Sequence, residues 1–189
     1  MCFIQDILQV GYTNFGLFLP LHLVTGLGLP PTLAASYVSV FAFGDLVGRL
    51  TGPALSDRLP PRWAWYCGGL AGAGAALLLL AVMQSWLLVA GLTGIAGLAS
   101  GVMVGVYPAL LSDELGPDNL ALTYPLSQTV AGLLNLAGPP LLALLATRLT
   151  TTAVMAVLGA SLIVGATPLF IASLVMCRSS TQQLNIVMN

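Results

Sequence analysis

The sequence predicts an all-α integral membrane protein built from six transmembrane helices, and three observations support this fold class. Hydrophobic residues make up 58% of the 189 residues and charged residues 6%, whereas soluble proteins carry about 25% charged residues. Apolar runs follow one another along the chain, and each is long enough to cross the ~30 Å hydrocarbon core of a bilayer. Short breaks separate the runs, which is typical of hairpins between antiparallel helices.

The apolar runs define the expected spans and their orientation. The spans cover residues 7–27, 33–56, 63–83, 86–111, 122–147 and 152–177, and residues 178–189 form a polar tail. Arginines favour cytoplasmic loops, and an even number of spans places both termini on one side. Arg58, Arg62 and Arg178 fall on that side and Arg148 on the other. We therefore expect the N- and C-termini and the tail in the cytoplasm.

The composition disfavours several classes of function. The net charge is −1 and lysine is absent, so the chain offers no basic surface to nucleic acid. The three cysteines have neither metal-ligand nor disulfide-framework spacing. The chain has one histidine, His22, and no His-Glu-x-x-His string, which argues against an intramembrane zinc protease. We therefore expect no enzyme, no cofactor and no metal site, and a lipid bilayer around the chain.

Two opposite charges lie inside the second apolar run. Asp45 and Arg49 are four residues apart, so on a helix they share one face and can pair. A charged side chain at the centre of a bilayer is unfavourable by about 2.5 to 3.5 kcal/mol. The pair is either a neutralised contact that helps a helix bundle to pack or an ion site in a translocation pathway. Intramembrane charges usually face a cavity, which favours the ion site.

Glycines and prolines recur at regular positions in the apolar runs. Two ridges have a glycine every four residues, at Gly44, Gly48 and Gly52 and at Gly97, Gly101 and Gly105. Such tracks let helix backbones approach closely, so we interpret them as packing surfaces. Prolines at Pro20, Pro108, Pro125, Pro139 and Pro140 are expected to kink or interrupt their helices.

The connection after the second run carries a motif. Gly52, Asp57, Arg58 and Arg62 stand in the pattern Gly-xxxx-Asp-Arg-xxx-Arg, which resembles the conserved loop motif of the major facilitator superfamily. In that family the motif lies between helices two and three and is echoed between helices eight and nine. The echo position would make this chain the C-terminal six-helix bundle of a twelve-helix transporter.

Four further segments resemble the monocarboxylate transporters of that superfamily. Residues 14–23 contain the Phe-Gly-x-x-x-Pro pattern of their seventh helix, and residues 39–49 contain the Asp-xxx-Arg pair of their eighth. Residues 115–117 and 137–141 are similar to their tenth-to-eleventh connection and to the Gly-Pro-Pro of helix eleven. The segments occur in the order and at the spacing of that family over nearly the whole chain.

The resemblance implies proton-coupled symport of small monocarboxylates across the plasma membrane. Arg49 would hold the substrate carboxylate, and Asp45 would pair with Arg49 in the empty site and take up the proton. Ser100 falls near the position where lactate-carrying members have a bulky aromatic residue, which implies a wider or different substrate range. Asn14 is a further candidate for the substrate site, although a hydrogen bond between helices explains it equally well.

The length of 189 residues corresponds to one half of such a transporter. Alternating access rocks one six-helix half against the other. The expected partners are therefore a small organic anion, a proton, and an N-terminal six-helix half, covalent or separate, or a second copy of the chain. The alternatives are a non-transporting six-span membrane subunit, a truncated product, or a major-facilitator transporter of another small organic solute.

Overall fold

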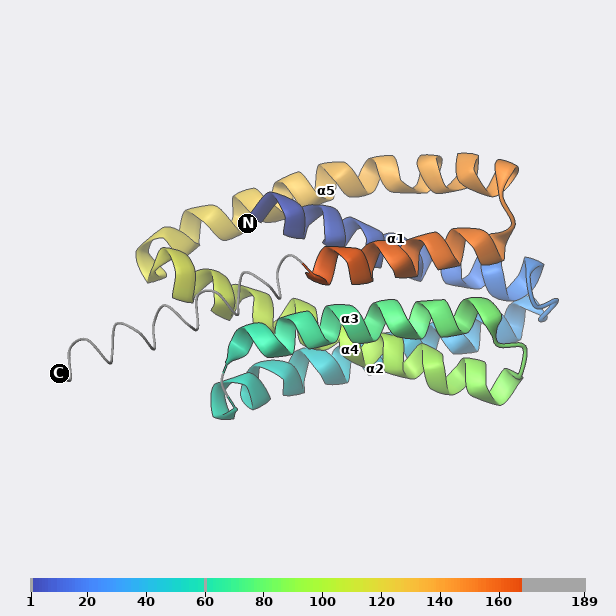
Figure 1. Ribbon diagram of the computed structural model, residues 1–189, viewed down its shortest axis with the longest axis horizontal. Coiled ribbons are helices and arrows are strands. Elements are labelled where there is room, and N and C mark those ends of the chain that lie inside the picture. Colours follow the sequence, from blue (N-terminus) through green and yellow to red (C-terminus); the bar gives the residue numbers. More distant parts are fainter. Residues whose placement is uncertain (1, 60, 168–189) are drawn as a thin grey trace.

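The computed structural model describes residues 2–59 and 61–167, which form a helical bundle without β-strands in these ranges (Figure 1). The helices are α1 (Cys2–Thr25), α2 (Pro31–Arg58), α3 (Arg62–Val82), α4 (Trp86–Leu115) and α5 (Pro117–Arg148). A shorter apolar helix, Thr151–Thr167, follows α5. Consecutive helices run in opposite directions. The α2–α3 and α4–α5 connections therefore lie at one end of the bundle, and the other connections lie at the opposite end (Figure 1).

Four helices in the described part are long and apolar enough to cross a membrane: α2, α3, α4 and the Asp118–Leu145 segment of α5. They overlap closely with the expected spans 33–56, 63–83, 86–111 and 122–147. The first expected span, 7–27, overlaps α1. The last expected span, 152–177, and the tail 178–189 extend beyond the described residues. Six crossings therefore remain a prediction.

The tightest helix contact joins α2 and α4 through the two glycine ridges. Both ridges lie in this contact, and each faces backbone atoms of the other helix. A Cβ atom on Gly48 would overlap the Leu98 carbonyl, and one on Gly101 would overlap the Asp45 carbonyl. Only glycine permits this approach, because any side chain would push the two backbones apart. The structure therefore gives both ridges the packing role that their spacing predicts.

Of the kinks or interruptions expected at the prolines, the interruptions are wrong. Helix α1 continues through Pro20, α4 through Pro108, and α5 through Pro125, Pro139 and Pro140. A proline inside a helix removes one backbone hydrogen bond and is unfavourable by about 3 kcal/mol. A full break within hydrocarbon would leave several more backbone groups without partners. Continuing the helix is therefore the less unfavourable outcome.

Helices α1 and α5 meet at a buried polar contact. Asn14 is 3% exposed, and its Nδ2 donates a hydrogen bond to Asn135 Oδ1 over 3.3 Å. Gly138, one turn along α5, faces the Asn14 side chain so closely that an added Cβ would overlap its amide group. Gly138 therefore provides the space that Asn14 occupies.

We expect Gly138→Ala to destabilise the bundle by about 1–3 kcal/mol, the usual range for overpacking. Removing the Asn14 amide in the double variant Gly138→Ala, Asn14→Ala should restore part of this loss. Gly132→Ala is the matched control, because a Cβ at Gly132 in the same helix meets nothing within 4 Å. Thermal unfolding in detergent measures all three variants. Equal melting temperatures for the Gly138 and Gly132 variants would contradict the assignment.

Candidate functional site

The mid-helix charges of α2 form an ion pair. Arg49 Nε donates to Asp45 Oδ2 over 2.8 Å, and the Arg49 and Asp45 side chains are 47% and 15% exposed. Asp45 therefore lies largely covered at the edge of the α2–α4 contact, while about half of the Arg49 side chain is exposed.

The glycine ridge of α4 holds the backbone beneath the ion pair. Gly101 packs against the Asp45 carbonyl and the Arg49 nitrogen, and Gly105 packs against the Arg49 backbone one turn further on. These contacts fix the stretch of α2 from which both charged side chains project. A guanidinium presented from a fixed backbone loses little freedom when it binds a planar carboxylate through two parallel hydrogen bonds.

Ser100 and Asn14 lie inside helix contacts in this conformation. Ser100 is 1% exposed, and its hydroxyl donates to the Gly97 carbonyl over 2.7 Å within α4. Asn14 is covered by α5 through Asn135 and Gly138. Neither side chain is open to solvent. A substrate would reach them only after the surrounding helices had moved.

The loop motif ties three helix ends together. Arg62, the first residue of α3, binds Asp57 near the end of α2 through Nη2 over 2.7 Å. Its Nη1 binds Asp113 near the end of α4, also over 2.7 Å. Gly52 packs on the Val102 backbone of α4. Arg58 is exposed and forms no ion pair within the described ranges.

Sequence reasoning missed the pairing of Asp113 with Arg62. The contact between Asp113 and Arg62 spans 51 residues, and no local pattern signals a pairing at such a separation. A second missed feature joins α4 to α5, where the hydroxyls of Tyr107 and Ser127 are 2.8 Å apart. A polar Ser127 within an apolar run was the available signal.

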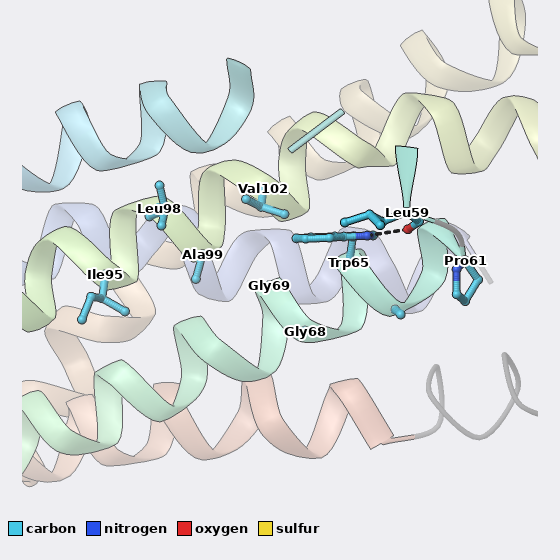
Figure 2. A pocket seen from close by; sticks show the side chains of 10 residues that line it. Leu59, Pro61, Trp65, Gly68, Gly69, Ile95, Leu98, Ala99 and Val102 are labelled. Atoms are coloured by element: carbon cyan, nitrogen blue, oxygen red, sulfur yellow. Dashed lines mark hydrogen bonds between the residues drawn. The ribbon is translucent and has the colours of Figure 1, made fainter. Parts of the chain in front are cut away.

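A groove between two helices lies apart from this site. It lies between α3 and α4 with a volume of about 560 Å³ and has no charged residue in its lining (Figure 2). Trp65 closes one end, where its indole Nε1 donates to the Leu59 carbonyl over 2.8 Å, and Ile95 lies toward the other (Figure 2). An apolar surface of this kind offers nothing to hold an anion. Within the described ranges, no three or more His, Cys, Asp or Glu side chains gather as a metal site would require.

The bundle of membrane-length helices, with an ion pair inside one of them, defines an integral membrane protein. The family model of the Major Facilitator Superfamily matches residues 1–184. The chain therefore belongs to this superfamily, whose members are membrane transporters rather than enzymes. No curated protein matches the chain.

Proposed function

We propose that the chain is the C-terminal bundle of a plasma-membrane transporter that carries small monocarboxylates together with a proton, with both termini in the cytoplasm. The observation that carries the proposal is the ion pair of α2, in which a half-exposed Arg49 binds a largely covered Asp45. Arginine suits a carboxylate because its planar guanidinium forms two parallel hydrogen bonds. In the ion pair, the carboxylate of Asp45 already contacts this guanidinium.

The pair supports a simple exchange. In the empty site Asp45 is the carboxylate partner of Arg49. Protonation neutralises Asp45 and weakens its ion pair with Arg49. The carboxylate of the substrate then replaces the Asp45 carboxylate as the partner of Arg49. The site then holds one proton and one anion more than before, and its net charge does not change. Neutral exchange avoids the free energy of carrying a net charge through a low-dielectric region.

Ser100 and Asn14 would complete the substrate site in another conformation. Both are buried here, and alternating access requires the helices around a midplane site to rearrange. Residue 100 is a serine where the lactate-carrying members of the family that the chain resembles have a bulky aromatic residue. This difference favours the second candidate function, a major-facilitator transporter of another small organic solute.

A partner half would cover the apolar outer face of α5. Four leucines on this helix are strongly exposed: Leu122, Leu126, Leu133 and Leu136 are 78%, 62%, 65% and 75% exposed. Lipid or a second protein surface must cover such a stripe. We propose an N-terminal six-helix half, or a second copy of this chain, as the partner required for transport.

Uptake of labelled pyruvate and lactate tests the proposed function. Cells would express the chain alone and joined to the N-terminal half of a monocarboxylate transporter, with intracellular pH and surface delivery recorded. Uptake with acidification by the joined form alone would support a transporter half, and uptake by the chain alone would support a homodimer. Surface delivery without uptake in either form would favour another solute or a non-transporting membrane subunit.

Asp45→Asn is expected to separate anion uptake from proton movement. The amide keeps the size of the carboxyl group but cannot exchange a proton, so uptake should stop or lose its dependence on external pH. Asp118→Asn is the control, because Asp118 is exposed at the start of α5. Uptake and intracellular pH are measured together between about pH 6 and 8. Full proton-coupled uptake by the Asp45 variant would remove Asp45 from the mechanism.

A further inference from the structure

One end of the bundle carries no acidic residue. This outer end contains the α1–α2, α3–α4 and α5–Thr151 connections, opposite the loop motif (Figure 1). Asp57, Asp113, Glu114 and Asp118 lie in or beside the connections at the other end, Asp6 lies near the start of α1, and Asp45 lies within α2. Residues 7–44, 58–112 and 119–189 contain no Asp or Glu. Arg148, exposed at the end of α5, therefore has no carboxylate near it in the sequence.

A helix N-terminus stands next to Arg148 at the same end. The helix Thr151–Thr167 begins three residues after Arg148. Thr150 caps it, since its Oγ1 accepts a hydrogen bond from the Ala153 nitrogen over 3.3 Å. The first N–H groups of a helix have no partner within the helix and carry a partial positive charge. Backbone donors, threonine hydroxyls and an arginine together are a chemistry that suits a small anion.

A buried histidine lies directly behind this N-terminus. His22 of α1 is 2% exposed, and neither ring nitrogen has a hydrogen-bond partner in good geometry, although the Leu80 backbone approaches the ring. A Cβ atom placed on Gly26 would lie 3.0 Å from both His22 Nδ1 and Thr151 Oγ1. The imidazole and the Thr151 hydroxyl therefore lie close together beside Gly26. A buried polar group without a partner is rare and suggests that a ligand completes it.

We propose that Arg148, the Thr151 hydroxyl and the first turn of helix Thr151–Thr167 form an outer subsite for a small carboxylate, with His22 positioned behind it. The proposal rests on the proposed function, because it assigns the step in which a carboxylate substrate is captured before it reaches Arg49. A positive end without acidic residues raises the local concentration of anions and speeds their encounter. The subsite thus captures the carboxylate substrate at the outer end, whereas the exchange of substrate and proton takes place at Asp45 and Arg49.

The single histidine supplies the test. The full chain, labelled with ¹³C and ¹⁵N in histidine and placed in lipid nanodiscs, gives one set of imidazole resonances. We expect sodium acetate to shift these resonances saturably, with no matching shift from sodium chloride at equal pH and ionic strength. Arg148→Gln should abolish the shift and Thr151→Val should weaken it. Arg58→Gln, at the other end of the bundle, should leave it unchanged.

Several outcomes would overturn the subsite: no saturable shift, an equal shift from chloride, or an unchanged shift in folded Arg148→Gln. Helical circular dichroism establishes that each variant is folded. The Arg49→Ala variant separates the two proposals, because it should retain the histidine shift while losing uptake. A shift without any uptake would support the subsite and reject the transport proposal. Arg49-dependent uptake without a shift of the histidine resonances would support the transport proposal and reject the subsite.

Discussion

Replacing Arg49 by alanine is expected to abolish carboxylate uptake by the transporter completed with an N-terminal half. The guanidinium is the cation that Asp45 contacts in the middle of α2, and 47% of its side chain is exposed. Hydrogen bonds to charged groups contribute about 1.5–3 kcal/mol each. Loss of a two-bond contact should therefore weaken substrate binding by more than about a hundredfold. The variant also leaves Asp45 without its arginine.

Uptake of labelled pyruvate by Arg49→Ala, Arg49→Lys and Asp118→Asn measures this effect. Lysine keeps the positive charge but lacks the planar fork, so Arg49→Lys should retain partial uptake with a raised KM. Asp118→Asn removes an exposed charge at the start of α5, outside the loop motif, and should transport normally once it reaches the surface. Normal uptake by Arg49→Ala would exclude Arg49 as the substrate-binding residue.

Gly101→Ala is expected to have the largest effect on the fold itself. Its added Cβ would overlap the Asp45 carbonyl, which is backbone and cannot rotate away. Helices α2 and α4 would have to separate over several turns, and we expect a loss of at least about 1–3 kcal/mol. Because the shift moves Asp45 and Arg49, uptake should fall together with stability.

Gly91→Ala is the matched control for this prediction. Gly91 lies in the same helix, but a Cβ there meets nothing within 4 Å, and alanine favours helix more than glycine. Thermal unfolding in detergent and the yield of folded protein compare the two variants. A Gly101→Ala protein as stable as Gly91→Ala would mean that the α2–α4 contact is looser than the structure describes.

Local periodicity explains which features the sequence could predict. The helical class, the paired charges of α2 and the two glycine ridges depend on residues four apart on one helix, and such patterns can be read along the chain. The family follows from the loop motif, whose residues lie close together. For Asp45, Arg49, Ser100 and Asn14, sequence and structure provide positions and contacts, and their roles in transport remain predictions.

Other features depend on contacts between residues far apart in the chain, or on competing free-energy terms, and neither can be read from local sequence patterns. The Arg62–Asp113 contact joins residues far apart in the chain, and only the folded bundle brings them together. The prolines do not break their helices, because their local preference for a break competes with the need to satisfy backbone groups in hydrocarbon. Asn14 and Gly138 likewise show their relationship only when α1 lies against α5.

The interlocked glycines also determine which parts of the bundle can move. Two backbones in contact along three successive turns resist sliding past one another, so we expect α2 and α4 to move as one unit. The Asp45–Arg49 pair projects from this unit. A rearrangement that opens the pair to one side of the membrane would therefore carry both helices and both charges together.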